Sequence, residues 1–152
     1  SSRLFQRVRE ELGAAYYVSA SPELFLDHGY LAISAGVDHT KLELVIKTVL
    51  EELRRLRDDL VPAQELQKSK DHLVGRFILS LETSDELASF YGGQEILIRT
   101  ILQPKDIIAR IQKVGADEVR RVARGMVGSA RLNLAVIGPY KDSRPLERVL
   151  TL

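Results

Sequence analysis

The stretch SSRLFQRVREELGAAYYV, residues 1–18, decides how the fold is read, because its pattern changes from helical to extended within a few residues. Its apolar side chains recur at helical spacing, which predicts a short amphipathic helix with Arg9 at the edge of the apolar stripe. Gly13 predicts the end of that helix, since glycine tolerates the left-handed backbone of a helix terminus. The residues that follow have the small, aromatic and β-branched character of a strand. The stripe consists of Leu4, Phe5, Val8 and Leu12.

A β-hairpin is predicted directly after this helix. Its strands span 14–21 and 30–37, and the second strand alternates larger apolar residues with small or polar ones. Asp27-His28-Gly29 between them is typical of a turn, with glycine supplying a positive φ. The alternation predicts that one face of the hairpin is buried.

The rest of the chain reads mainly as helix. Two capping boxes, Thr40 with Glu43 and Thr83 with Glu86, predict helix starts, because the paired side chains satisfy free backbone N–H groups. A compact apolar run at 132–137 predicts a third strand. Helices are expected over 40–60, 62–81, 83–101, 104–114, 119–126 and 145–150.

This order of elements predicts an α+β fold in which helices pack on one face of a mainly antiparallel or mixed sheet. We expect a single domain over residues 1–152. Three strands make a thin sheet for so much helix. We therefore expect that N-terminal strands are missing upstream of Ser1, or that a partner completes the sheet.

Composition excludes several classes of protein. The 152 residues carry 22 Lys and Arg against 21 Asp and Glu, and 45% are hydrophobic, which excludes a disordered chain. The near-neutral charge argues against nucleic-acid binding, and no apolar run is long enough for a membrane span. The composition predicts a soluble protein. The absence of cysteine leaves both the cytoplasm and the periplasm open.

Residues of this chain alone do not form a complete catalytic set. The histidines are His28, His39 and His72, and none has a second histidine three or four residues away. We therefore predict no metal site and no cofactor site in this chain. A basic face at 110–131 keeps open the alternative of an unrelated α+β binding module.

The opening stretch resembles the insulinase-like metallopeptidase family, which includes pitrilysin and the mitochondrial processing peptidase. The family's non-catalytic half carries Ser-Ser-Arg-Leu-Phe-Gln followed by Arg-Glu-x-x-Gly-Leu-Ala-Tyr. Residues 1–6 match the first motif throughout, and Arg9-Glu10, Gly13 and Ala15-Tyr16 follow in register. Ala14 departs from the usual leucine. The first motif is specific, and the order of the later elements is consistent with the family.

The resemblance implies a C-terminal half that lacks the zinc motif of its partner. Members of this family have two α+β halves that close around a peptide substrate, and zinc is bound in the N-terminal half. The C-terminal half supplies an Arg and a Tyr seven residues apart, which correspond to Arg9 and Tyr16 here. This chain alone is then expected to be inactive. The sequence leaves open whether the two halves belong to one chain or to two, and whether the protein forms a dimer. It also leaves open the alternative that this is a scaffold half of a non-catalytic family member.

The residue chemistry suits this assignment. A helix end, one Gly13 turn and a strand start can bring Arg9 and Tyr16 to one cleft. A guanidinium holds a carbonyl or carboxylate with fixed geometry, and a phenol donates to a developing oxyanion. The competing interpretation pairs Arg9 with a nearby Glu and packs Tyr16 in the sheet. Tyr17 is expected to face the opposite side of the strand.

Overall fold

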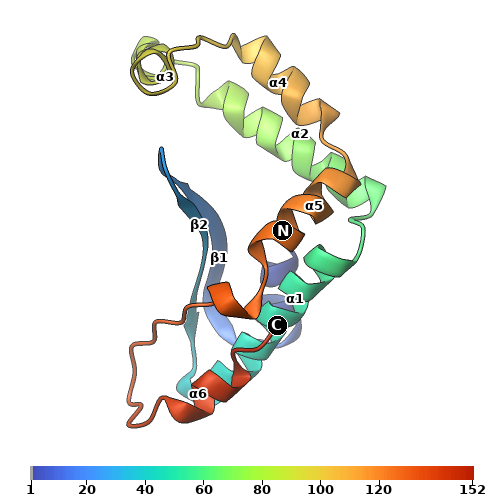
Figure 1. The fold of residues 1–152 in the computed structure, drawn as a ribbon, viewed down its shortest axis with the longest axis vertical. Coiled ribbons are helices and arrows are strands. Elements are labelled where there is room, and N and C mark those ends of the chain that lie inside the picture. Colours follow the sequence, from blue (N-terminus) through green and yellow to red (C-terminus); the bar gives the residue numbers. More distant parts are fainter. Residues whose placement is uncertain (1) are drawn as a thin grey trace. The chain divides into compact units, whose positions relative to one another are not determined.

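The computed structural model describes residues 2–152; Ser1, the first residue of the quoted stretch, lies outside the described residues. It shows an antiparallel hairpin and a series of helices (Figure 1), so the predicted α+β class is confirmed. The chain forms two compact units. One consists of the described residues up to Asp59 together with Arg120–Leu152, and the other is Leu60–Val119. The single domain over 1–152 stays a prediction.

The first helix is a π-helix, η1 (Phe5–Glu11), rather than the ordinary α-helix that the spacing predicts. The N–H of Leu12 donates to the carbonyl of Arg7 at 3.1 Å, five residues back. Leu4 and Val8 are buried, as the stripe predicts. Gly13 ends the helix with a φ of +52°, a conformation that costs glycine little. Wide turns of this kind are rare and often mark functional sites.

The hairpin is longer than predicted. Strands β1 (Ala15–Leu24) and β2 (Gly29–Val37) pair antiparallel and run side by side in Figure 1. The pairing shifts between Ala15, which lies opposite Val37, and Tyr17, which lies opposite Gly36. One extra residue, Tyr16, therefore forms a β-bulge.

Helix α1 (Leu42–Asp58) carries two apolar clusters. The first joins η1, the hairpin and α1, and the second joins α1 to the C-terminal segment. The cap differs from prediction, since Thr40 and Glu43 form no capping box. Instead Asp38 caps the short 3₁₀ helix η2 (His39–Lys41) that precedes α1. The buried members are Leu4, Val8, Ala14, Val18 and Val45 in the first cluster, and Leu42, Ile46 and Leu50 in the second.

The predicted strand at 132–137 is wrong, because these residues have no ladder partner among the residues that the structure describes. Their apolar side chains are used differently. Leu132 and Val136 pack on the second cluster of α1 instead of extending the sheet. A 3₁₀ turn, η3 (Ser129–Arg131), precedes this segment. Helix α6 (Arg144–Val149) follows it and lies along α1 (Figure 1).

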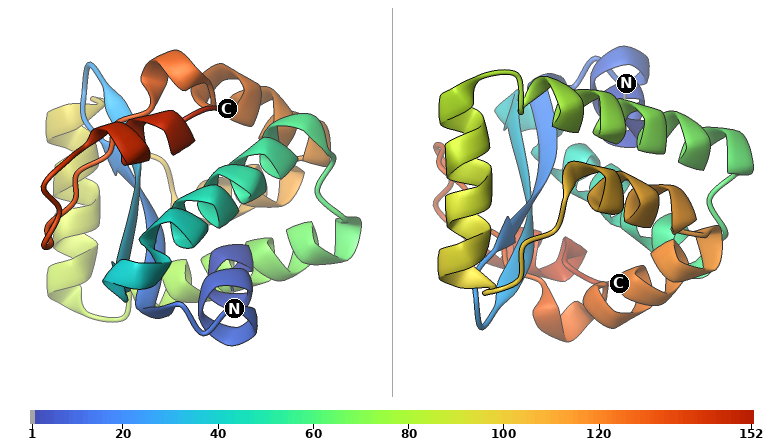
Figure 2. Two further views of the ribbon diagram at one scale, coloured as in Figure 1. Left: turned by 90° about the horizontal axis from the view of Figure 1, so that it is seen from below. Right: turned by 90° about the horizontal axis from the view of Figure 1, so that it is seen from above.

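The second unit consists of helices. The box of Thr83 and Glu86 is confirmed as the cap of α3. Helix α3 runs unbroken but ends at Leu97 rather than at residue 101. The amide of Gln94 is buried and bonds both the N–H and the carbonyl of Leu102. The helices are α2 (Ala63–Leu79), α3 (Ser84–Leu97) and α4 (Pro104–Lys113), and α2 and α4 lie side by side in Figure 2.

Helix α5 (Ala116–Met126) spans the boundary between the two units in the sequence. Within residues 2–152, none of the helices combines the length and the apolar character that crossing a membrane requires.

Candidate functional site

Arg9 and Tyr16 line one hollow at the surface of the first unit. Its volume is about 380 Å³, and it lies where η1 ends and β1 begins. The residues come from three adjacent parts of the chain, namely the end of η1, the Gly13 turn with the start of β1, and the segment before α1. The lining residues are Arg9, Gly13, Ala14, Ala15, Tyr16, Asp38 and Lys41.

The guanidinium of Arg9 is held by an aromatic ring. Its central carbon lies 4.9 Å from the centroid of the Phe5 ring, one turn earlier in η1. A cation over a ring face is attracted by the ring quadrupole, and its N–H groups stay available at the edge. Among the described residues, no carboxylate lies within ion-pair distance of Arg9. The competing interpretation, an ion pair with a nearby Glu, does not describe this geometry.

Tyr16 points away from the sheet core because it is the bulged residue. It is 81% exposed, so it does not pack in the sheet. Its neighbour Tyr17 lies over Gly36, where an added Cβ would come within 2.5 Å of the Tyr17 ring. Bulges commonly re-aim one side chain next to a site, and here the re-aimed side chain is the phenol.

Lys41 closes the hollow on the side of η2. Its Nζ donates to the carbonyl of Gly13 at 3.1 Å. This bond ties the turn between Arg9 and Tyr16 to the start of α1. The ammonium also adds a second positive charge beside Arg9.

Asp38 supplies the negative charge of the hollow. Its carboxylate accepts hydrogen bonds from the backbone N–H of Thr40 at 2.8 Å and from the Thr40 hydroxyl at 2.7 Å. These bonds hold the pKa of the Asp38 carboxyl below its usual value, and the bond from the hydroxyl has the larger effect. The hollow therefore presents two cations, Arg9 and Lys41, the phenol of Tyr16 and the carboxylate of Asp38. One oxygen of that carboxylate already accepts hydrogen bonds from Thr40.

Replacing Thr40 with Val should raise the pKa of the Asp38 carboxyl, because valine removes the hydroxyl that stabilises the charged form. A carboxyl whose pKa is lowered by folding adds stability above its unfolded pKa and loses it as the pH falls through the folded pKa. The variant should therefore be less stable than the wild type at neutral pH, and the two should converge in acid. Carboxyl-carbon NMR titration measures the pKa directly. Thr83→Val, which removes the hydroxyl that caps α3 far from Asp38 in the sequence, is the control. An unchanged Asp38 pKa in Thr40→Val would contradict the prediction.

The described residues do not fit a zinc centre. They contain no group of three or more His, Asp or Glu side chains placed to hold a metal ion. His28 lies at the hairpin turn and pairs with Asp27, whereas His39 begins η2 beside Asp38. The histidines therefore occupy separate elements, each with a local partner or on an exposed helix.

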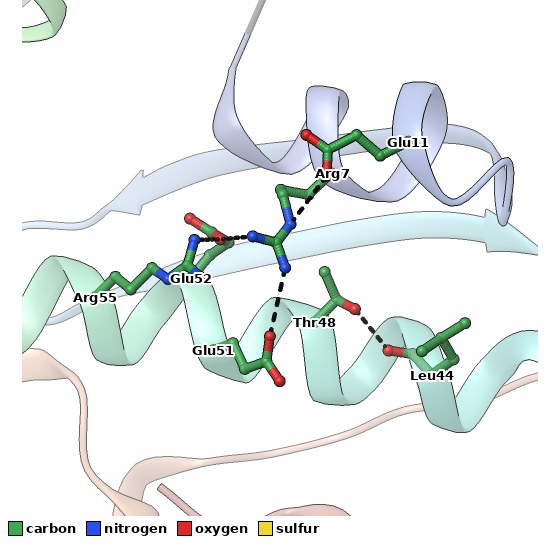
Figure 3. A network of polar contacts seen from close by, with 7 residues as sticks. All are labelled: Arg7, Glu11, Leu44, Thr48, Glu51, Glu52 and Arg55. Carbon is green, nitrogen blue, oxygen red and sulfur yellow. Dashed lines mark hydrogen bonds and ion pairs between the residues drawn. The ribbon is translucent and has the colours of Figure 1, made fainter.

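Sequence reasoning missed the ion pair between Arg7 and Glu52, which joins η1 to α1. The charged run at 51–59 reads as a solvated helix face, but Glu52 is only 3% exposed. Its carboxylate pairs with Arg7 from η1 and with Arg55 from its own helix (Figure 3). The only signal in the sequence is that residue 52 lies on the same face of α1 as the first cluster.

Comparisons with known proteins find similarity to a peptidase family and to proteins named zinc proteases. A family model described as the peptidase M16 inactive domain matches residues 1–73. An uncharacterized zinc protease of Streptomyces coelicolor is 35% identical over 144 residues, which are 95% of this chain and 31% of that protein. One of Bacillus subtilis is 34% identical over 139 residues, which are 91% of this chain and 34% of that protein. The chain thus spans about a third of the length of these relatives.

Solved structures share the fold. A chain of Complex III2 from Candida albicans, Inz-5 bound, superposes with a TM-score of 0.76 at 17% identity, over 85% of this chain and 31% of that one. A protease from Helicobacter pylori gives 0.71 at 21% identity, over 82% and 30%. The family model and the sequence relatives, independently of these structures, show that the chain belongs to the insulinase-like metallopeptidase family, as part of its inactive half.

Proposed function

We propose that this chain contributes Arg9 and Tyr16 to the peptide-binding cleft of a zinc-dependent endopeptidase. The observation that carries the proposal is that both side chains line one open hollow. Both groups remain available to a ligand, since Arg9 has no carboxylate partner among the described residues and Tyr16 is 81% exposed. Membership of this family argues against the alternative of an unrelated binding module.

Each group has a distinct task in this proposal. The guanidinium of Arg9 holds a carbonyl or carboxylate of the bound peptide through its planar fork of N–H donors. The phenol of Tyr16 donates a hydrogen bond to the carbonyl oxygen on which negative charge develops during hydrolysis. Lys41 and the Gly13 turn keep the two groups on one side of the first unit.

The remaining machinery is assigned to a partner half. The described residues hold no group that could bind zinc, and relatives named zinc proteases are about three times as long as this chain. We therefore place zinc in an N-terminal half, in the same chain or in a second subunit. This chain alone should not cleave peptides.

Replacing Arg9 with Ala in the complete protein should lower kcat/KM for peptide cleavage about 10- to 100-fold. A hydrogen bond to a charged group contributes roughly 1.5–3 kcal/mol, which corresponds to this range. Arg9→Lys keeps the charge but loses the fork, so it should recover only part of the activity. Steady-state cleavage of a fluorogenic peptide measures the effect.

Gln6→Ala is the matched control, because Gln6 is also exposed on η1 but does not line the hollow. Its kcat/KM should stay near that of the wild type. Full activity of Arg9→Ala in a correctly folded protein would reject the proposed role. That result would favour a scaffold half that takes no part in catalysis.

A further inference from the structure

The guanidinium of Arg7 pairs with three carboxylates, and the two that lie in α1 join η1 to that helix. Its nitrogens lie 3.4 Å from Glu11 in η1, and 3.6 Å and 3.5 Å from Glu51 and Glu52 in α1. Figure 3 shows the side chain between the two helices, with its planar head directed at α1. Arg7 thus forms an ionic link between the helix that carries Arg9 and the longest helix of the first unit.

One of these carboxylates, that of Glu52, is too deeply buried for water to solvate its charge. The side chain of Glu52 is 4% exposed, so its charge requires partners inside the protein. Arg55 supplies one at 2.9 Å from its own helix, and Arg7 supplies the other from η1. The need of Glu52 for a positive charge therefore holds Arg7 against α1.

The position of Arg7 determines how η1 is turned about its axis. The helix has seven residues, and a helix this short has little stability of its own, even though the Ser2 hydroxyl accepts a hydrogen bond from the N–H of Phe5 in its first turn. Leu4 and Val8 bury it against the hairpin and α1, but apolar contact is non-directional and tolerates rotation. The charged fork of Arg7 selects one orientation. In that orientation Arg9, two residues later, reaches the hollow.

We propose that Arg7 is a positioning residue, which through its ion pairs with Glu52 and Glu51 holds η1 so that Arg9 faces the peptide. This inference rests on the proposed function of Arg9. Arg7 does not line the hollow, so its effect on the peptide passes through Arg9.

The test is a double-mutant cycle in the complete protein. Arg7→Ala should lower kcat/KM for a fluorogenic peptide about tenfold, because displacement of a binding group by a fraction of a helical turn misplaces its hydrogen bonds. In the Arg9→Ala background the same change should alter kcat/KM by less than about twofold, since the group that Arg7 positions is gone.

Arg55→Ala is the matched control. It removes the other cationic partner of Glu52 but no link to η1, so it should lower the melting temperature as Arg7→Ala does while leaving kcat/KM near wild type. Arg7→Lys serves if Arg7→Ala does not fold. It keeps one charge near Glu52 and should restore folding, with kcat/KM below wild type only when Arg9 is present.

The outcomes separate the two proposals. If Arg9→Ala by itself leaves cleavage unchanged, the proposed function fails. If Arg9→Ala lowers cleavage but Arg7→Ala has the same effect with and without Arg9, the proposed function stands and the positioning role of Arg7 is overturned. A loss of kcat/KM in Arg55→Ala equal to that in Arg7→Ala would also overturn it, because burial of Glu52 rather than the link to η1 would then explain both.

Discussion

Replacing Tyr16 with Phe in the complete protein should lower kcat for peptide cleavage about 10²- to 10³-fold, the usual cost of losing one donor to a developing oxyanion. Phenylalanine keeps the ring and removes only the hydroxyl. The ring is 81% exposed, so the free energy of unfolding should hardly change. KM should change much less than kcat, because the hydroxyl interacts most strongly with the charge that develops in the transition state.

Tyr17→Phe is the control that the chain itself provides. Tyr17 is the next residue, carries the same hydroxyl and is also exposed, but its ring lies over Gly36 and does not line the hollow. Its kcat should match that of the wild type. If both variants lose activity equally, or if neither does, the phenol of Tyr16 does not have the proposed role.

The family resemblance singled out Arg9 and Tyr16, and their meeting at one hollow could be expected from sequence because it is local. Seven residues separate the two side chains, and the route between them consists of one helix end, one glycine turn and the start of one strand. Hydrophobic spacing and the Gly13 signal specify these elements without reference to distant residues. The capping box of Thr83 with Glu86 was predictable for the same reason.

Features that depend on distant packing could not be predicted in this way. The bulge that re-aims Tyr16 is seen only in the register with β2, where the Tyr17 ring covers Gly36. The burial of Glu52 depends on Arg7, which lies 45 residues earlier in the chain. Residues 132–137 have strand-like composition, but Leu132 and Val136 pack on α1 instead of extending the sheet.

Replacing Leu50 with Ala should destabilise the chain by about 2–5 kcal/mol, since it removes a large core side chain and leaves a cavity. Leu50 is 3% exposed and is one of the three buried residues of the second cluster on α1. The C-terminal segment packs on this cluster through Leu146 and Val149. Urea unfolding gives the change in free energy. Backbone amide exchange should show faster opening of α6, because its apolar contacts with α1 are weakened.

Leu44→Ala makes the same substitution in the same helix at a side chain that is 45% exposed. Both variants change helix propensity equally, so the difference between them isolates core packing from the intrinsic preference of alanine for helix. Leu44→Ala should cost less than about 1 kcal/mol, as expected for a surface position. If the two variants were equally stable, the contact of the C-terminal segment with α1 would not contribute to the fold. The segment at 132–137 would then have no reason to lie against this helix in preference to the sheet.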